Sequence, residues 1–430
     1  MTNIATATSV HQAETLLFFT LLQLAIIIVA ARVGGAVARR FAQAAVVGEI
    51  ITGILLGPSL FGWLAPDVFE LVFRSAPPAP MQILSQIGLL LLMFQIGMEF
   101  DFAHLGERRH RRSVAWVASA SLVLPFVLGF FFGWLLAPPA PANDPLIGGL
   151  FVATAFAITA LPILGRIMIE FQLTRSPIGV IAISAAAIND VVGWLLLALV
   201  STLAISQLDP LAFALKIALV GLFFAVSWWG VRPVVRRIVA RANPGRERLP
   251  VNLLGGLLAL IFVAGMITFK LGIFAIFGGF MMGVILHDEH GLREAWETRV
   301  GHFVGVFFLP VFFTYTGLRT DIGSLDSLGS WGICALAVLL ATVGKFVGAY
   351  FGARRSGLSR PEASILGIMM NTRALMELIV INVGYDLGVI SGETFTMLVI
   401  MAIFSTVITT PCLRRWLPRI GHTAPPVVRE

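Results

Sequence analysis

The run IGVIAISAAAINDVVGWLLLALVSTL, residues 178–203, is apolar along almost its whole length but carries Asn189 and Asp190 near its middle. Its length and composition are typical of a helix that crosses a membrane. A charged group near the centre of a bilayer costs roughly 2.5–3.5 kcal/mol on insertion scales. Membrane proteins retain such a group where it faces a partner, a water-filled cavity or an ion. Asp190 is therefore the first candidate for the functional residue of a transporter.

The composition places the whole chain in the same class. Hydrophobic residues make up 58% of the 430 residues and charged residues only 12%, against about 25% charged residues in soluble domains. Thirteen apolar stretches recur along the chain, which predicts an all-α polytopic membrane protein with about thirteen transmembrane helices. They lie at roughly 15–33, 45–64, 82–99, 113–137, 146–169, 178–204, 210–230, 250–268, 271–287, 301–318, 330–353, 362–384 and 393–414.

The net charge of +7 does not indicate a nucleic-acid partner, because the basic residues fall unevenly between the expected spans. Clusters such as RRHRR at 108–112 and RPVVRRIVAR at 232–241 lie in one set of connecting segments. The opposite set holds only Arg74, Lys270 and Arg319. The positive-inside rule then predicts an N-terminus outside and a C-terminus inside the cytoplasm. We expect an integral protein of the cytoplasmic (inner) membrane, surrounded by lipid bilayer.

The sequence has no motif of an enzyme or of an ATP-driven pump. It contains no glycine-rich phosphate loop, and its histidines show no metal-ligand spacing. Few polar residues follow the last expected span. We therefore expect no enzymatic activity, no cofactor and no soluble regulatory domain, with residues 1–430 forming a single membrane transport domain.

The expected spans divide into two blocks of six that are joined by one helix. The first block covers 15–204, the linker helix covers 210–230 and the second block covers 250–414. A single intervening span reverses the second block relative to the first. This arrangement predicts two inverted six-helix repeats, with ion sites near the midplane of the membrane where the repeats meet.

The fifth span of each block carries polar or proline residues within apolar helix. The first contains Thr154, Thr159 and Pro162, and the second contains Arg373 and Glu377. Interruptions of this kind predict crossing broken helices whose freed backbone groups bind ions or hold charges. The last two residues are four apart, so they can form an ion pair on one helical face and compensate charge there.

Several long sequence segments, spread along nearly the whole chain, are distinctive enough to be compared with those of known families. They include VVGEIITGILLGPSLFGWL at 46–64, AFAITALPILGRIMIEFQL at 155–173, SAAAINDVVGWLLLAL at 184–199 and NTRALMELIVINVGYDLGVI at 371–390. Together these segments resemble the monovalent cation:proton antiporter-2 family, within the sodium/hydrogen exchanger superfamily. The resemblance is closest to the plant cation/proton exchanger type and its bacterial relatives.

The resemblance implies a fold and a set of residue roles. It implies a homodimer in which some helices form a scaffold and others form a core that exposes the ion site alternately to each side. The ion-binding aspartate of the family falls on Asp190, and the polar residue before it falls on Asn189. The threonine of the first broken helix falls on Thr159 and the intramembrane lysine falls on Lys345.

The chemistry of one carboxylate suits exchange. Desolvation favours the neutral form of Asp190 and a nearby cation favours its ionised form, so a proton and Na⁺ or K⁺ compete for the same group. Hard cations prefer oxygen ligands, which Thr154, Thr159 and Asn189 can supply beside Asp190. In the family that the chain resembles, an amide at the position of Asn189 accompanies electroneutral exchange. We therefore expect one proton to be exchanged for one cation.

Alternative roles stay open for the same residues. Asp190 can form a structural ion pair with Lys345, Asn189 can brace two helices, and Arg373 with Glu377 can brace a broken helix. Lys345 either titrates or neutralises the ends of the broken helices. Two alternatives stay open for the whole chain. One is a passive cation channel, although no TVGYG-type filter motif is present. The other is an organic-anion transporter that uses Arg373 and Lys345 as ligands.

Overall fold

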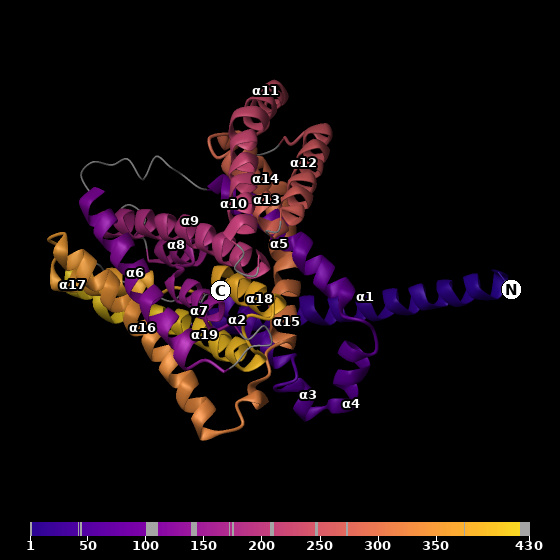
Figure 1. Cartoon of the computed structure of the whole chain (residues 1–430), viewed down its shortest axis with the longest axis horizontal. Helices are drawn as coiled ribbons and strands as arrows, with labels where there is room; N and C mark the ends of the chain where they lie inside the picture. Colours follow the sequence, from indigo (N-terminus) through magenta and orange to yellow (C-terminus); the bar gives the residue numbers. More distant parts are fainter. Residues whose placement is uncertain are drawn as a thin grey trace.

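The computed structural model of the chain is a bundle of helices (Figure 1). Among the residues that the structure describes, the β-structure is limited to one isolated bridge between Gly245 and Arg248. The described residues are 2–41, 43, 45–99, 111–138, 144–171, 173, 176–206, 210–245, 248–271, 274–373 and 375–421. The prediction of an all-α membrane protein is confirmed.

The helices follow the expected apolar stretches closely. Those of the first half are α1 (Thr2–Arg40), α2 (Ala45–Leu55), α3 (Phe61–Leu64), α4 (Pro66–Phe69), α5 (Ala79–Glu99), α6 (Arg111–Leu135), α7 (Pro145–Ala157), α8 (Leu161–Glu170) and α9 (Pro177–Ser206). Those of the second half are α10 (Pro210–Ala225), α11 (Arg232–Ala242), α12 (Val251–Lys270), α13 (Ala275–Val284), α14 (His290–Trp296), α15 (Leu309–Leu318), α16 (Leu328–Arg355), α17 (Arg360–Met370), α18 (Leu375–Asp386) and α19 (Gly392–Trp416).

The long helices are apolar enough to cross a bilayer. Within the described ranges, 8 helices meet the length and hydropathy of a membrane span, or 9 if a pair bent by 42° around residues 301–304 counts as one. Other helices are shorter because the chain breaks within an apolar stretch, as between α7 and α8. The total of thirteen spans and the inverted repeats stay predictions.

The linker helix is longer than the predicted range 210–230. A π-helical turn at Val226–Val231 carries α10 directly into α11, so the helix continues to Ala242 and the arginines after 230 are helical. Contacts of the first of these arginines stabilise the additional helical residues. Arg232 donates to Asp288 at 2.9 Å, and its guanidinium carbon lies 4.2 Å from the centroid of the Trp228 ring.

Side-chain caps fix the residue at which α7 and α17, the first halves of the two broken helices, begin. The Asp144 side chain accepts the N–H of Leu146 at 3.0 Å at the start of α7. At the start of α17, Ser359 and Glu362 form a capping box. Such caps satisfy the first N–H groups of a helix and set where it starts. At the opposite end of α17 the Thr372 hydroxyl donates to the Met369 carbonyl at 2.9 Å, whereas the last carbonyl groups of α7 accept hydrogen bonds from residues far along the chain.

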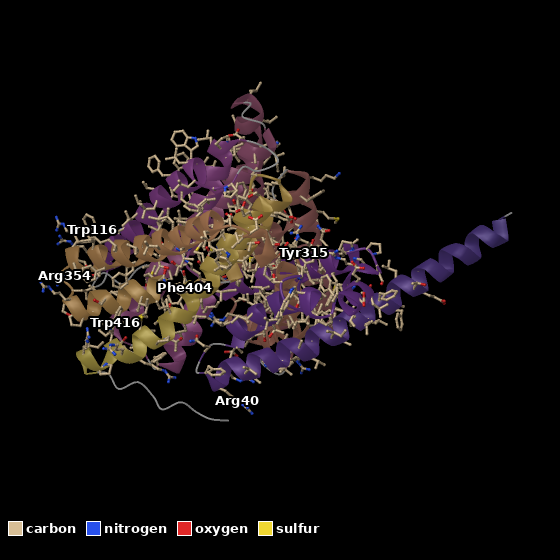
Figure 2. The ribbon with its side chains drawn as sticks, turned by 90° about the horizontal axis from the view of Figure 1, so that it is seen from below. Arg40, Trp116, Tyr315, Arg354, Phe404 and Trp416 are labelled. Carbon is tan, nitrogen blue, oxygen red and sulfur yellow. The ribbon has the colours of Figure 1, made fainter. Side chains whose placement is uncertain are left out.

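Aromatic and basic side chains gather at the end of α16. Figure 2 shows Trp116, Arg354 and Trp416 at the same edge of the molecule. Arg355 lies over the Trp116 ring, with 5.4 Å between the guanidinium carbon and the ring centroid. Tryptophan with arginine at helix ends is typical of a membrane–water interface.

Glycines let two of the helices approach very closely. At Gly283 of α13 a Cβ atom would lie 2.1 Å from the Phe94 carbonyl oxygen, and at Gly279 it would lie 2.3 Å from that of Leu90, both on α5. The segment GGFMMG at 278–283 therefore packs backbone against backbone, as small residues allow in membrane bundles.

Gly283→Ala should lower stability, because the added methyl group forces α5 and α13 apart. We expect a cost of about 1–3 kcal/mol, as for other overpacked sites, seen as a lower unfolding temperature of the purified protein in detergent. Gly256→Ala on α12 is the control, since among the described residues no atom outside its own helix backbone and chain neighbours lies within 4 Å of its Cβ position. An equal unfolding temperature for the two variants would contradict the packing argument.

Candidate functional site

The fifth apolar stretch of each block is interrupted where polar or proline residues occur. α7 ends at Ala157, Ile158 is extended with φ −72° and ψ 146°, and α8 begins at Leu161. Pro162 has no N–H to donate to the carbonyl group four residues earlier, so the first helix cannot continue through it. α17 and α18 flank the second interruption.

The two interruptions contact one another. The backbone N–H of Ala160 donates to the Thr372 carbonyl at 3.0 Å, and the Thr159 hydroxyl donates to the Met370 carbonyl at 3.2 Å. Both threonines are completely buried. Thr159 therefore joins the two broken helices, and its oxygen retains lone-pair capacity for a ligand.

Two cationic side chains bind the open end of α7. Arg373 donates from Nη1 to the Ala155 carbonyl and from Nη2 to the Phe156 carbonyl, each at 2.8 Å. Lys345 donates from Nζ to the Ala157 carbonyl. The last carbonyl groups of a helix lack partners within it and carry partial negative charge. Lys345 and Arg373 supply both hydrogen-bond donors and positive charge at that end.

Arg373 also forms an ion pair within α17–α18. Its Nη1 lies 3.2 Å from Glu377 Oε1, and both side chains are at most 1% exposed. Its Nη2 reaches the Ala341 carbonyl of α16 at 3.3 Å. Arg373 thus links α7, α16 and α18, and Glu377 is the acid that balances its charge.

Asn189 and Asp190 lie at the middle of α9, which packs against all four halves of the broken helices. They are 0% and 2% exposed. The Asn189 amide donates from Nδ2 to Ser121 Oγ of α6 at 2.9 Å. Asp190 lies within electrostatic reach of Lys345, so the exchange candidate and a cation at the α7 end act on one another.

Thr154 lies one turn before the end of α7. Its hydroxyl donates to the Leu150 carbonyl at 2.8 Å, and its own carbonyl accepts the Ile158 N–H at 3.3 Å. The hydrogen of Thr154 is therefore used within its own helix, unlike that of Thr159.

The structure joins four of the predicted site residues in one bonded group around the broken helices: Thr159, Lys345, Arg373 and Glu377. Ser121 was not among the predicted residues. α6 carries three serines, and nothing in the spacing of Ser113, Ser119 and Ser121 distinguishes one from the others. Only its contact with Asn189 reveals Ser121.

A second polar group joins α15 to α18. Arg319 donates to Asn382 Oδ1 at 3.0 Å and pairs with Asp386. Its guanidinium carbon lies 4.7 Å and 5.0 Å from the ring centroids of Tyr315 and Tyr385. All five of these residues line cavities, and one cavity of about 1070 Å³ is bordered by Arg319 and both tyrosines.

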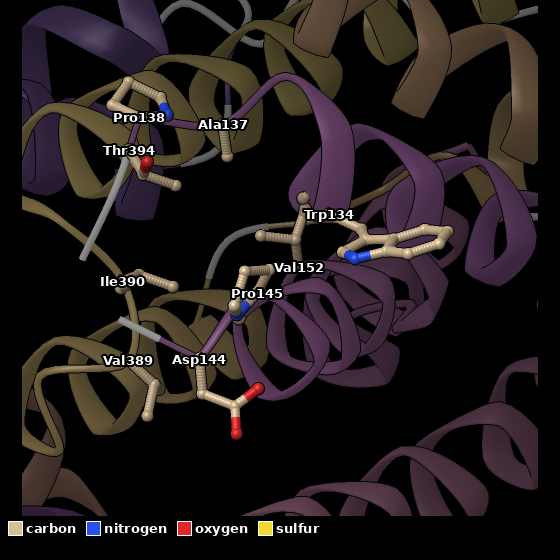
Figure 3. Close-up of a pocket in the computed structure, with 11 residues that line it drawn as sticks. Trp134, Ala137, Pro138, Asp144, Pro145, Val152, Val389, Ile390 and Thr394 are labelled. Atoms are coloured by element: carbon tan, nitrogen blue, oxygen red, sulfur yellow. The ribbon is translucent and has the colours of Figure 1, made fainter. Parts of the chain in front are cut away.

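A separate cavity of about 140 Å³ lies at the start of α7. Figure 3 shows Asp144 and Pro145 on one side of it and Ile390 and Thr394 on the other. None of the predicted site residues lines this cavity. The candidate site is instead a closely packed region at the centre of the bundle.

Comparison with known proteins gives the family. The model of the transmembrane sodium/hydrogen exchanger family matches residues 26–418. The Na⁺/H⁺ antiporter NhaS4 of Synechocystis is 37% identical over 411 residues, which cover 94% of this chain and 99% of that protein. Cation/H⁺ antiporter 18 of Arabidopsis thaliana is 35% identical, and the match covers 95% of this chain but 50% of that longer protein.

The fold agrees with a solved structure. The sodium proton antiporter MjNhaP1 of Methanocaldococcus jannaschii, at pH 8, superposes with a TM-score of 0.68 over 95% of this chain and 99% of that one. Sequence identity is only 15%, so this match shows the fold alone. With the family match spanning both broken helices and α9 between them, the chain belongs to the sodium/hydrogen exchanger family of integral membrane transporters.

Proposed function

We propose that the protein is a secondary antiporter that exchanges Na⁺ or K⁺ for H⁺, with proton and cation competing for Asp190. The position of Asp190 carries the proposal. It is buried at the middle of α9, a helix that packs against both broken helices, and it lies within electrostatic reach of Lys345. The antiporter names of the relatives support the same activity.

The bonds around α7 support a division of labour among the charged residues. Lys345 and Arg373 hold the α7 carbonyl groups, and Glu377 balances Arg373. In our proposal these three compensate charge, whereas Asp190 takes up and releases the transported ions. Thr159, Thr154 and Asn189 provide oxygen atoms near it for the cation.

Asn189 supports electroneutral exchange. An amide does not titrate in the physiological range, so it adds no second proton to the cycle. Its hydrogen bond to Ser121 gives it a fixed structural place without a charge. One carboxylate then carries either one proton or one monovalent cation.

Alternating access requires part of the bundle to move. Arg319, through its contacts with Asn382 and Asp386, opposes movement between the two helices that it joins. It connects α15 to α18 on the membrane side that has few basic loop residues. We propose that this side is the outside. In the proposed arrangement, the blocks 15–204 and 250–414 are two inverted six-helix repeats that are joined by the linker helix. The protein would form a homodimer in the cytoplasmic membrane, with its N-terminus outside and its C-terminus inside.

Asp190→Asn should abolish exchange, because the amide can no longer bind a proton and a cation in turn. The measurement uses liposomes that contain the purified protein and an internal pH dye. Addition of Na⁺ or K⁺ should dissipate an imposed proton gradient with the wild type only.

Asp67→Asn is the matched control for this experiment, since Asp67 is exposed on α4. It should transport at the wild-type rate. Full activity of Asp190→Asn would refute competition at this residue.

The exchange rate of the wild type should not depend on membrane potential, because each cycle moves no net charge. Initial rates with Na⁺ are compared at equal K⁺ on both sides, with and without valinomycin, which holds the potential at zero. A marked acceleration by valinomycin would show that charge accumulates, and would contradict one-for-one exchange.

Glu377→Gln should destabilise the protein strongly, because it leaves the Arg373 charge buried without its acid. Breaking a buried ion pair in this way costs about 3–5 kcal/mol, measurable as a lower unfolding temperature in detergent. Glu70→Gln is the control, since the Glu70–Arg74 pair is 3.8 Å long and largely exposed. Exposed pairs contribute about 0–1 kcal/mol, so equal effects of the two substitutions would contradict the compensating role.

A further inference from the structure

The side chain of Ser121 on α6 is the contact that orients Asn189. Both residues are 0% exposed. Ser121 Oγ donates to the Ala118 carbonyl at 3.2 Å and accepts the Asn189 Nδ2 group at 2.9 Å. These two bonds join the residue beside Asp190 to a neighbouring helix.

The direction of these bonds decides how the amide is turned. A serine hydroxyl has a single hydrogen, and that hydrogen points to Ala118. Only lone pairs therefore face Asn189, and only the NH₂ end of the amide can meet them. The amide oxygen must point the other way.

Asn189 Oδ1 is buried and has no hydrogen-bond partner among the residues that the structure describes. Buried polar atoms are almost always satisfied, and an exception calls for an explanation such as an ion that occupies the site in another state. This oxygen belongs to the residue next to Asp190. The two residues are consecutive on α9, with their side chains about 100° apart around the helix axis.

We infer that Ser121 is a positioning residue, which holds the Asn189 amide with its oxygen directed at the cation that binds Asp190. This inference rests on the proposed antiport function. Ser121 does not contact the ion. It stabilises the one amide orientation that supplies a cation ligand, and it opposes the orientation that would present the NH₂ group to a cation.

The arrangement also matches an amide better than a carboxylate at position 189. A carboxylate at position 189 would place an oxygen against the lone pairs of Ser121 Oγ, unless the Ser121 hydroxyl gave up its hydrogen bond to the Ala118 carbonyl. The hydrogen-bond direction at Ser121 thus favours the uncharged residue on which one-for-one exchange depends.

Ser121→Ala tests the inference in the liposome assay with Na⁺ and with K⁺. Loss of the bond lets the amide rotate, so the apparent KM for the cation should rise by roughly five- to tenfold, the range that one lost hydrogen bond corresponds to. The maximal rate should stay within about twofold. Ser121→Thr keeps the hydroxyl and should have the same KM as the wild type.

Ser201→Ala is the matched control. Ser201 is also 0% exposed, and it lies on α9 itself, but its Oγ has no hydrogen-bond partner in the described part of the chain. It should leave the KM unchanged. In an Asn189→Ala background, Ser121→Ala should have no further effect on the KM, because no amide is left to orient.

The outcomes separate this inference from the proposed function. An unchanged KM in Ser121→Ala, or a lower maximal rate and unfolding temperature without a KM change, would overturn the positioning role while the loss of exchange in Asp190→Asn keeps the antiport proposal. If Ser121→Ala does not fold, Ser121→Cys replaces the hydroxyl with a weaker hydrogen-bonding thiol. A raised KM in the wild type that is absent in Asn189→Ala supports the coupling, and an equal change in both backgrounds, or none in either, overturns it. Exchange that persists in Asp190→Asn would instead refute the antiport mechanism itself.

Discussion

The carboxyl end of α7 stops inside the protein, and the structure of the site follows from how its carbonyl groups are satisfied. Water cannot reach them, since the surrounding residues from Ala153 to Ala157 are at most 2% exposed. Unsatisfied carbonyl groups within a membrane protein cost several kcal/mol each. Lys345 and Arg373, which lie 188 to 218 positions later in the chain, provide the donors. A helix can be broken at the centre of this bundle only because these two side chains arrive there.

This arrangement constrains the remaining charges. Arg373 requires Glu377 nearby, and the pair fixes the second broken helix against the first. The Thr159 hydroxyl and the Ala160 N–H strengthen the same crossing. In our proposal, this bonded crossing, against which α9 packs, supports Asp190 as its charge changes in each transport cycle.

Close packing of helices and the polar centre depend on one another. Gly283 and Gly279 allow α5 and α13 to touch at the backbone, and Gly348 does the same for α16 against α6, where a Cβ atom would lie 2.3 Å from the Ala120 carbonyl oxygen. That second contact places α16, which carries Lys345, directly beside α6, which carries Ser121. The fold itself is shared with a solved structure of 15% sequence identity.

The sequence by itself determined the membrane class, the apolar stretches and the two interruptions, because hydropathy, proline and polar residues within apolar helix act locally. The family followed from the resemblance of long sequence segments. The sequence also singled out Asp190, Asn189, Lys345, Arg373 and Glu377 as candidate site residues, since charged or amide groups within a membrane span are few. Only the tertiary structure decided what these residues bind. The Arg373–Glu377 pair was visible from its spacing, but the attachment of Arg373 and Lys345 to α7 and of Asn189 to Ser121 was not. Those bonds join residues from 68 to 218 positions apart, and no local pattern records which carbonyl or hydroxyl a distant side chain will reach.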